Sequence, residues 1–441
     1  MHSILQFLRR ILPKPVLTAY HRLLSLAAGV LYGHPSGELI VIGVTGTSGK
    51  TTTSYFMAHA LEADGAKSGS TSTALFKVAD REWVNDTKMT MLGRFQLQKL
   101  LRKMVDAGCT YAVIETSSQG IIQHRHKEIA YDACVFTKLT PEHIEAHGGF
   151  ENYKQAKIEL FRHTASLPRK QIKGKQVPRF AILNRDDEHA KDFAMPGFDR
   201  IVWFGEQENA DVRASNIRTD ANGTRFAIQG TEVFMATPGR VMAMNALAAI
   251  ATAEAFGIAR EKIAKRLAEL PPMPGRFERI DEGQAFTVIV DYGFEPAALG
   301  HLFDFADTLK GTGHIIHVTG STGGGRDVAR RGIVGRLSAK RSDVTIVTNE
   351  DPYDEDPRRI IDDVANGALA GGKIEDATLF RINDRKTAIQ RAIEIAKPGD
   401  VVLITGKGSE PVMAVAHGRK IPWDDRIEVR AAIRGKTIPL K

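Results

Sequence analysis

Residues 41–53, VIGVTGTSGKTTT, pass from an apolar run into glycine, serine, lysine and threonine, the residue types of a phosphate-binding loop. Glycines let backbone N–H groups turn toward phosphate oxygens, and the start of a helix adds its dipole. The Lys50 ammonium can reach terminal phosphates, and the Thr51 hydroxyl can ligate Mg²⁺. Val44 replaces the first glycine of the strict pattern, so a plain turn before a helix is the alternative. We predict a nucleotide site formed by Gly46, Thr47, Ser48, Gly49, Lys50, Thr51 and Thr52.

A second group of candidates begins at the end of the apolar run YAVIE, residues 111–115. Ligands of open α/β sheets bind at the carboxyl ends of strands, so the Glu115 carboxylate could hold Mg²⁺ together with Thr51. Glu115 could equally cap a helix. Four polar residues that follow could bind an anionic substrate, or be helix-start and surface residues: Ser117, Ser118, His124 and Arg125.

Acidic and imidazole side chains also crowd into the segment 136–161, as Glu142, His143, Glu145 and His147. The H-x-x-x-H spacing resembles a helical zinc pair, but Gly148 and Gly149 would end any helix there. Hard oxygen ligands with one imidazole suit Mg²⁺ better than zinc. Lys157 follows on a predicted helix. Solvated surface charge is the alternative to a metal site.

Alternating strand-like and helix-like segments must position these residues. Helix-like stretches such as residues 95–108 separate several apolar runs, which lie at 38–44, 111–115, 132–137, 179–184 and 200–205. This alternation predicts a mostly parallel sheet covered on both faces. Residues 211–236 alternate over short runs and predict a small antiparallel hairpin region.

The chain is then interrupted by LPPMPGRFERI, residues 270–280, whose three prolines predict a linker. Four more apolar runs with helical segments between them predict a Rossmann-like domain beyond it. We therefore expect an α/β protein in three parts. They are a short helical N-terminal cap at 1–38, an ATP-binding P-loop central domain with a mostly parallel sheet at 39–270, and a Rossmann-like C-terminal domain at 271–441.

Composition agrees with two or three soluble domains, since the chain has 441 residues, of which 43% are hydrophobic and 25% charged. The net charge of +8 suits anionic ligands such as nucleotides. Basic residues are dispersed and lack aromatic partners, so we expect no nucleic-acid binding. Cys109 and Cys134 are too few and too isolated for a zinc site, which favours buried thiols in a reducing compartment.

The N-terminal stretch, residues 3–33, is basic and apolar, but Pro13 and Pro15 split it. Its apolar run at 23–32 is short for a membrane-spanning helix, and no small-residue cleavage site follows it. We expect a helical cap packed on the body of a cytoplasmic protein. An interfacial helix, giving peripheral contact with the inner membrane surface through residues 1–35, is the alternative.

Taken together, these motifs resemble the Mur ligase family, the ATP-dependent amide-forming enzymes of peptidoglycan precursor synthesis. The resemblance runs from about residue 38 to the C-terminus. It rests on GTSGKTT, ETSSQGIIQHR, FTKLTPEHIEAHGGFENYKQAK, NRDD (184–187), MPGRFERI, DYGFEPAAL (291–299), GGGRDVARR (323–331), DPYDEDP (351–357), NDRKTAI (383–389) and GKGSE (406–410).

The resemblance implies that an acceptor carboxylate attacks the γ-phosphate of ATP, and that an amino-acid amine then displaces phosphate from the acyl phosphate. Lys50 and the loop amides would offset charge on the transferring phosphoryl group. It implies two Mg²⁺ ions, one beside Thr51 and Glu115. The second would be held by Glu115, by His143 and by a carbamylated Lys157, whose carbamate turns a cation into a carboxylate-like ligand.

Further site residues come from the same resemblance. Asn245 matches a position that contacts adenine, and Arg276 and Asp291 match positions near the nucleotide, although they could be a hinge and a strand-end cap. Arg326 would reach phosphates or the interdomain cleft. We assign substrate binding to Thr90, Ser117, Ser118, Arg125, Arg326, Asp351, Tyr353 and Glu410.

The sequence departs from the family in three places. Only some 38 residues precede the first predicted strand, so we expect no counterpart of the family's N-terminal domain that holds the uridine part of the substrate, and a lipid-linked acceptor becomes conceivable. Glu350-Asp351-Pro352-Tyr353 replaces Asp-Asn-Pro-Arg, so the arginine that would pair with the distal carboxylate of diaminopimelate is missing. Asp351 adds negative charge there, which favours lysine or ornithine. Two histidines are missing from GKGSE and DYGFEP, while Glu410 could still hold the incoming α-amine.

We therefore expect an ATP-dependent acid–amino acid ligase that works as a monomer on a muramoyl-peptide precursor of peptidoglycan. Alternatives are a ligase or amidotransferase subunit acting on a lipid-linked precursor, and an enzyme like folylpolyglutamate synthetase. Two distant cysteines cannot form the four-cysteine zinc ribbon of the known amidotransferase branch. A non-catalytic, nucleotide-gated protein on a membrane surface is the alternative from another class.

Overall fold

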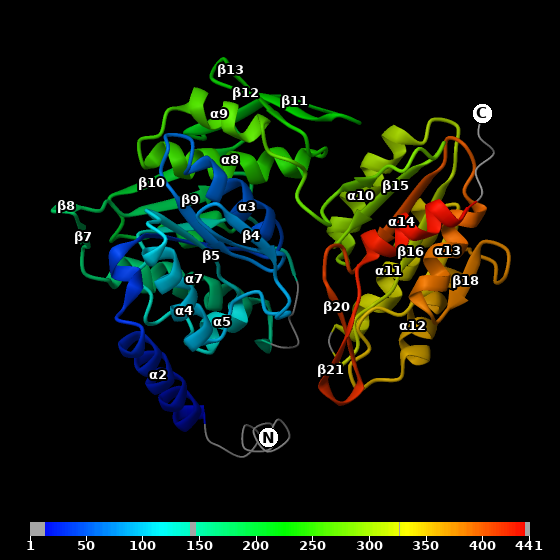
Figure 1. The fold of residues 1–441 in the computed structure, drawn as a ribbon, viewed down its shortest axis with the longest axis horizontal. Coiled ribbons are helices and arrows are strands. Elements are labelled where there is room, and N and C mark those ends of the chain that lie inside the picture. Colours follow the sequence, from blue (N-terminus) through cyan, green and yellow to red (C-terminus); the bar gives the residue numbers. More distant parts are fainter. Residues whose placement is uncertain (1–13, 142–146, 326, 437–441) are drawn as a thin grey trace. The chain divides into compact units, whose positions relative to one another are not determined.

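The structure, a computed structural model, describes residues 14–141, 147–325 and 327–436. The chain divides into two compact units, each built on its own β-sheet (Figure 1). Unit 1 comprises the chain up to Asn216 together with Phe226–Val233 and Ala243–Ala268. Unit 2 comprises Ile217–Arg225, Phe234–Met242 and the chain from Glu269 onward.

The larger sheet has the strand order β13-β12-β11-β10-β9-β6-β1-β5-β2-β3-β4. The run from β10 to β2 is parallel, as predicted, and β3 and β4 extend it antiparallel at one edge. Residues 211–236, predicted as a hairpin region, form three successive neighbouring strands joined by two-residue turns at the other edge of this sheet. Its strands are β1 (Ile40–Thr45), β2 (Ser68–Thr71), β3 (Leu75–Val78), β4 (Arg81–Val84), β5 (Tyr111–Glu115), β6 (Ala133–Phe136), β9 (Phe180–Asn184), β10 (Arg200–Gly205), β11 (Val212–Asp220), β12 (Gly223–Ile228) and β13 (Thr231–Met235).

Helices cover both faces of this sheet, which explains why its central strands are apolar along their whole length. Every residue of β5, β6 and β9 is buried. Helices α4 (Arg94–Asp106), α5 (Ser118–Ile122) and α7 (Phe150–Ser166) lie on one face. Helices α3 (Lys50–Ala60), α8 (Arg240–Ala255) and α9 (Arg260–Ala268) lie on the other (Figure 1). A two-stranded ribbon, β7 (Gln171–Ile172) and β8 (Lys175–Gln176), stands apart from the sheet.

Close packing of α7 on β1 depends on a residue without a side chain. A Cβ added to Gly43 would lie 2.9 Å from the Tyr131 ring and 3.2 Å from a methyl carbon of Leu160. Such distances are too short for ordinary van der Waals contact. Gly43 therefore lets α7 approach the strand that leads into the phosphate-binding loop.

Unit 2 contains a six-stranded sheet of order β14-β15-β19-β16-β17-β18, in which only β14 is antiparallel to its neighbour. The four predicted apolar runs are β15 (Thr287–Asp291), β16 (Ile315–Thr319), β17 (Val344–Thr348) and β19 (Val401–Thr405), which confirms the Rossmann-like domain. The sequence did not indicate β18 (Leu379–Ile382), which is short and half exposed. The remaining elements are β14 (Glu278–Ile280), β20 (Val412–Val415), β21 (Arg419–Pro422), α10 (Pro296–Leu309), α11 (Val328–Arg341), α12 (Pro357–Ala370), α13 (Arg385–Ile395) and α14 (Asp425–Gly435).

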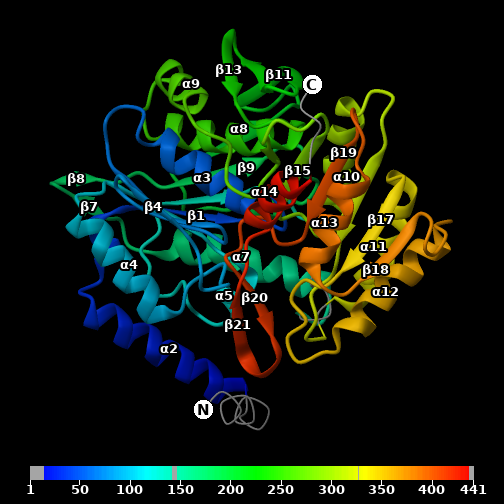
Figure 2. The ribbon, with the colours of Figure 1, turned by 45° about the vertical axis from the view of Figure 1, so that its right-hand side comes forward.

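Within the predicted N-terminal cap, the structure shows helix α2 (Lys14–Leu31), which runs alongside α4 (Figure 2). The Ser25 hydroxyl donates to the carbonyl of His124 at 2.8 Å and accepts from the Arg94 guanidinium at 3.0 Å. Arg102 binds the carbonyls of Tyr32 and Gly33 at the other end of the helix. Across the described residues, we find no helix with the length and apolarity needed to cross a bilayer.

Two buried histidines, one in the turn after α5 and one within α7, pack edge to face. The ring centroids of His126 and His163 are 5.0 Å apart, and neither ring nitrogen of His126 has a hydrogen-bond partner among the described residues. Burial lowers the pKa of His126 to about 2 and that of His163 to about 4. In an unfolded chain both would titrate near pH ~6.5. The unfolded chain therefore binds more protons than the folded one below that pH, so acid must destabilise the fold.

We expect the free energy of unfolding to fall as the pH drops from about 6.5 toward about 4, by up to ~1.4 kcal/mol per pH unit for each of the two histidines. His126→Leu should make this decline shallower, because it removes one of the two titrating groups. Urea unfolding over a pH series measures the slope. Equal slopes for wild type and His126→Leu would contradict the assignment.

Candidate active site

The predicted phosphate-binding loop lies between the end of β1 at Thr45 and the start of α3 at Lys50. Its two glycines are required by space as well as by backbone conformation. Gly49 has a φ of 83°, and a Cβ there would lie 2.5 Å from the Asn245 side-chain oxygen. A Cβ on Gly46 would collide with the Thr137 hydroxyl. Only glycine fits both positions.

The segment after β6 holds this loop in place. The Thr47 N–H donates to the Lys138 carbonyl at 2.6 Å, and the Thr137 hydroxyl donates to the Ser48 carbonyl at 2.7 Å. The Tyr153 hydroxyl, from α7, donates to the Thr47 hydroxyl at 3.1 Å. These bonds occupy loop carbonyls and the Thr47 side chain. The loop is therefore shaped before any phosphate binds.

Lys50 begins α3, and its ammonium donates to the Thr47 carbonyl at 2.7 Å. The side chain thus folds back over the loop, so the cation lies beside the residues predicted to bind phosphate. This arrangement offers positive charge next to the N-terminus of α3, whose dipole also favours anions.

Glu115 ends β5 and is almost completely buried, with 1% of its surface exposed. The Thr51 hydroxyl donates to its two carboxylate oxygens at 3.1 and 3.0 Å. Thr73 donates to it through both its N–H, at 2.7 Å, and its hydroxyl, at 3.1 Å. All these donors are neutral, and no described cation forms an ion pair with Glu115. A buried carboxylate without a cation is costly, so the Thr51–Glu115 pair fits a hard metal ion such as Mg²⁺.

Thr90 and Arg125, predicted separately, lie close to each other, because Arg125 binds the carbonyl of the residue after Thr90. The Thr73 hydroxyl contacts Thr90 Oγ1 at 3.1 Å, so Thr73 links Thr90 to Glu115. The Arg125 guanidinium donates to the Met91 carbonyl and holds the Gln123 side chain at 2.7 Å. Sequence reasoning missed Thr73, because nothing local marks a threonine in a turn between two strands.

The two serines after Glu115 have different surroundings. The Ser117 hydroxyl accepts from the Gly120 N–H at 3.2 Å and caps α5, which is the helix-start alternative. The Ser118 hydroxyl lies 3.1 Å from His147 Nε2. Among the acidic and imidazole residues predicted nearby, Glu142, His143 and Glu145 lie outside the described residues.

Lys157 of α7 contacts the phosphate-binding loop. Its ammonium donates to the Gly46 carbonyl at 2.6 Å and lies 4.3 Å from the centre of the Tyr153 ring. Only 1% of its surface is exposed. A lysine predicted from a distant segment is thus buried directly beside the loop.

Asn245 of α8 is also beside the loop. Its side-chain oxygen is 3.4 Å from the Thr53 hydroxyl, and it forms the wall that excludes a side chain at Gly49. Contact with adenine stays a prediction for this residue.

In unit 2, Asp291 is buried at the end of β15 and accepts from the N–H groups of Phe277, at 2.8 Å, and Gly293, at 2.5 Å. Burial raises the pKa of Asp291, and the charge of Arg276 opposes that rise. The Arg276 guanidinium lies over the Tyr292 ring at 4.4 Å. Asp291 therefore shapes the strand end, while its predicted proximity to nucleotide stays untested.

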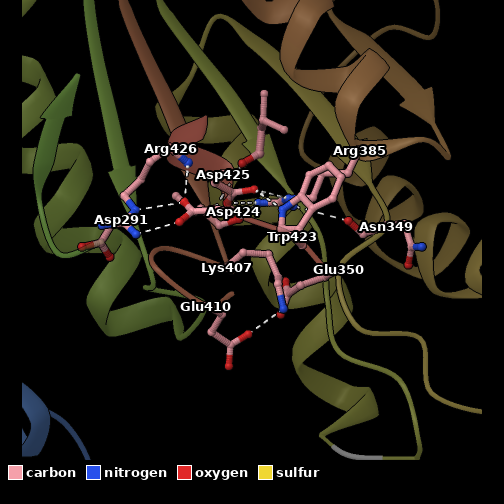
Figure 3. A network of polar contacts seen from close by, with 12 residues as sticks. Asp291, Asn349, Glu350, Arg385, Lys407, Glu410, Trp423, Asp424, Asp425 and Arg426 are labelled. Atoms are coloured by element: carbon pink, nitrogen blue, oxygen red, sulfur yellow. Dashed lines mark hydrogen bonds and ion pairs between the residues drawn. The ribbon is translucent and has the colours of Figure 1, made fainter. Parts of the chain in front are cut away.

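A charged cluster in unit 2 brings together Asp351 and Glu410, which were predicted from motifs almost sixty residues apart. Figure 3 shows the contact between Lys407 and Glu410. The ammonium of Lys407, fully buried, donates to the Asp351 carboxylate at 3.0 Å and to Glu410 at 2.6 Å. It also donates to the Val412 carbonyl at 2.8 Å. Lys407 stands inside the quoted GKGSE motif, but its sequence neighbours gave no reason to choose it over Glu410.

Glu350 lies next to this cluster and is also buried. The Thr322 hydroxyl donates to one carboxylate oxygen at 2.9 Å, and the other has no hydrogen-bond partner among the described residues. Burial and the neighbouring Asp351 charge raise the pKa of Glu350. Tyr353, two residues after Asp351, has a φ of 52° and donates its N–H to the Ala414 carbonyl at 3.2 Å. Arg326 lies outside the described residues.

Behind the cluster, a second buried ion pair fixes α13 to α14. Arg385 binds the Asp425 carboxylate through two nitrogens, at 2.8 and 2.7 Å, with both side chains fully buried. Arg385 also donates to the Thr405 carbonyl at 2.8 Å, at the end of β19 just before Lys407. This pair positions the strand end from which the Lys407 cluster projects (Figure 3).

Comparison with known families matches both parts of the chain. Residues 44–253 match the Mur ligase middle domain, and residues 275–408 match the Mur ligase glutamate ligase domain. The UDP-N-acetylmuramyl-tripeptide synthetase of Roseiflexus sp. (strain RS-1) is 38% identical, with 96% of this chain and 84% of the relative covered. The UDP-N-acetylmuramoyl-L-alanyl-D-glutamate–2,6-diaminopimelate ligase of Geobacillus kaustophilus (strain HTA426) is 36% identical over the same shares.

Solved structures show the same fold. A UDP-N-acetylmuramoyl-L-alanyl-D-glutamate–2,6-diaminopimelate ligase matches with a TM-score of 0.59 and 28% identity, covering 90% of this chain and 78% of that one. The MurF ligase of Thermotoga maritima, solved with ADP, matches with a TM-score of 0.65 and 18% identity, covering 93% and 82%. At that identity the second match supports the fold alone.

The charge of Glu115 can be tested with its neutral isostere. Glu115→Gln keeps the shape and an acceptor for Thr51 but removes the charge that a metal ion would balance. We expect nucleotide-dependent phosphate release to fall by about 100-fold or more, without a loss of unfolding free energy. Phosphate assays and urea unfolding measure the two effects.

Glu62 provides the matched control, because its buried carboxylate is compensated inside the protein. Although burial opposes it, hydrogen bonding from His59 and the charge of Lys77 hold the pKa of Glu62 at about 2. Glu62→Gln should therefore lower the unfolding free energy and leave phosphate release near the wild-type rate. Full activity in Glu115→Gln would contradict the metal role.

Proposed function

The chain belongs to the Mur ligase family, the ATP-dependent ligases that add amino acids to UDP-muramoyl peptides in peptidoglycan synthesis, and on that premise we propose that it extends a UDP-muramoyl-dipeptide by one amino acid. The observation that carries the proposal is the buried Glu115 carboxylate bonded to Thr51 at the phosphate-binding loop. Thr51 and Glu115 are residue types suited to metal-assisted nucleotide chemistry, and both lie in the part of the chain that matches the Mur ligase middle domain.

In the proposed reaction the dipeptide carboxylate attacks the γ-phosphorus of ATP, and ADP leaves with the bonding electrons of the broken P–O bond. The amine of the amino acid then attacks the acyl carbon, loses a proton and expels inorganic phosphate, which leaves an amide. Lys50 and the loop N–H groups offset the negative charge of the transferring phosphoryl group. Bound Mg²⁺ would supply further charge neutralisation, and we propose that Thr51 and Glu115 hold it.

Lys157 is proposed to work as a carbamate that helps to hold a second Mg²⁺ together with Glu115 and His143. Support comes from its position, since its nitrogen is buried and lies 2.6 Å from the Gly46 carbonyl of the loop. A carbamate at that nitrogen would turn a cation beside the loop into an oxygen ligand suited to Mg²⁺.

The amino acid is proposed to be one with a cationic side chain, such as lysine or ornithine. Tyr353 occupies the position where the family carries the arginine that pairs with a distal carboxylate. Three carboxylates gather around Lys407, those of Glu350, Asp351 and Glu410, so the local charge favours an ammonium group over a second carboxylate. Glu410 is proposed to bind the α-amine.

The proposal includes a setting for the enzyme. It would work as a cytoplasmic monomer, with peripheral contact to the inner membrane surface through residues 1–35.

The amino-acid preference can be tested by phosphate release with UDP-muramoyl-dipeptide and single amino acids. We expect release to require both co-substrates, with a higher kcat/KM for lysine than for meso-diaminopimelate. Tyr353→Arg should shift the ratio toward diaminopimelate by roughly 10- to 100-fold, as a charge-assisted hydrogen bond would. A wild-type preference for diaminopimelate would refute the cationic side chain, and release with no pair would refute the acceptor.

The carbamate can be tested on the same assay. Lys157→Ala should reduce the rate by about 100-fold, because a ligand of the second metal ion is lost. Added chloride or bicarbonate should restore part of it by supplying an anion to the vacated space. Lys154 on the same helix pairs with Asp192 at the surface, so Lys154→Ala is the control that should keep full activity. Unchanged activity in Lys157→Ala would show that the metal role is wrong.

A further inference from the structure

Helix α2 is apolar on both of its long faces. Leu24, Ser25 and Ala28 are turned toward the body of unit 1, where Ser25 makes the hydrogen bonds to His124 and Arg94. The opposite face is exposed and carries the large side chains Val16, Tyr20, Leu23, Leu26, Val30 and Leu31. A surface helix normally turns polar residues to water, so an exposed apolar face opposite the packed one is expected to be covered as well.

The exposed face forms one continuous stripe. Val16, Tyr20, Leu23, Ala27 and Val30 follow spacings of four and three residues, which place them in a line along the helix. With Leu26 and Leu31 they span about 140° of the helix circumference at 100° per residue. A continuous exposed apolar stripe of this kind indicates an interaction site.

The charge around this stripe selects the kind of partner. Arg22 is exposed at its edge, and α2 holds no acidic residue at all. No aspartate or glutamate occurs in the sequence before Glu38, whereas Arg9, Arg10, Lys14 and Arg22 all do. A second copy of α2 would bring no carboxylate to pair with Arg22. Anionic lipid headgroups would, and the apolar stripe could enter the region just below them.

We infer that the stripe Val16-Tyr20-Leu23-Ala27-Val30 docks unit 1 on an anionic lipid bilayer, with α2 lying in the plane of the interface and Arg22 at headgroup level. This inference rests on the proposed function only for the location of the enzyme at a membrane. It does not depend on which amino acid is added. Docking along α2 leaves the chain peripheral, in keeping with a described structure in which no helix can span a bilayer.

Vesicle co-sedimentation of the full chain tests the inference. We expect binding to phosphatidylcholine vesicles that contain phosphatidylglycerol, weaker binding to pure phosphatidylcholine, and release as salt is raised. Leu23→Glu/Val30→Glu should reduce the partition coefficient at least tenfold, because both side chains would carry charge into the interface. Arg22→Glu should weaken binding to the anionic vesicles and leave binding to neutral ones unchanged.

The control replaces equally exposed apolar residues of unit 2. Ile374 and Ile427 are 64% and 63% exposed, close to the 66% and 64% of Leu23 and Val30. Ile374→Glu/Ile427→Glu should bind vesicles like the wild type. Thermal melts confirm that each variant is folded, and Leu23→Ala/Val30→Ala serves if the glutamate pair unfolds α2.

Three results would overturn the inference. They are a wild-type chain that stays in solution with anionic vesicles, a glutamate pair that still binds them, and a concentration-dependent dimer that the glutamate pair dissociates. Ligase activity is measured in parallel on a soluble UDP-linked acceptor, where the glutamate pair should match the wild type. Activity without vesicle binding would refute the docking surface alone, and vesicle binding without activity would refute the proposed reaction alone.

Discussion

The carboxylate of Glu115 is the constraint around which unit 1 is arranged. It is buried at the end of β5, yet its described partners are neutral groups of Thr51 and Thr73. Burying a charge without a counter-ion costs several kcal/mol, so the fold must gain from the charge in another way. We propose that a metal ion held with nucleotide phosphates supplies the missing positive charge. The same bonds tie the start of α3 to the turn between β2 and β3, so metal binding would act on both segments.

The rest of unit 1 holds the Glu115 carboxylate and the phosphate-binding loop next to each other. Parallel pairing of β1 with β5 and β6 brings the carboxyl ends of these three strands to the same end of the sheet. From there Thr137 holds the loop carbonyl of Ser48. On the face of the sheet covered by α7, Gly43 leaves room for this helix to approach β1. Lys157 of α7 donates to the Gly46 carbonyl. A larger residue at Gly43 would therefore disturb the loop through the helix, although it touches no loop residue itself.

Sequence patterns predicted site residues that are neighbours in the sequence, or that lie at the ends of adjacent parallel strands. The order strand, loop, helix predicted the phosphate-binding loop, and the rule that strand ends meet predicted Glu115 beside Thr51. Thr73 and Lys407 escaped notice because their roles come from tertiary contacts of a turn and a buried cluster. The short, half-exposed β18 escaped for a related reason, since it lacks the continuous apolar pattern of a buried parallel strand. His143 and Arg326 lie outside the described residues, so their roles stay predictions from the family resemblance.

The Lys407 cluster of unit 2 and Glu115 of unit 1 balance buried charge in different ways. In unit 2, Lys407 neutralises Asp351 and Glu410, and Arg385 neutralises Asp425, so these strand ends are set before any substrate arrives. In unit 1, the described hydrogen-bond donors of Glu115 are neutral, and we propose that a cation from outside the chain balances its charge. Removing a carboxylate from the Lys407 cluster would leave a buried cation without its counter-ion. Neutralising Glu115 would instead remove the energetic cost of a buried anion. The surroundings of a buried carboxylate therefore decide whether its charge serves the fold or the reaction.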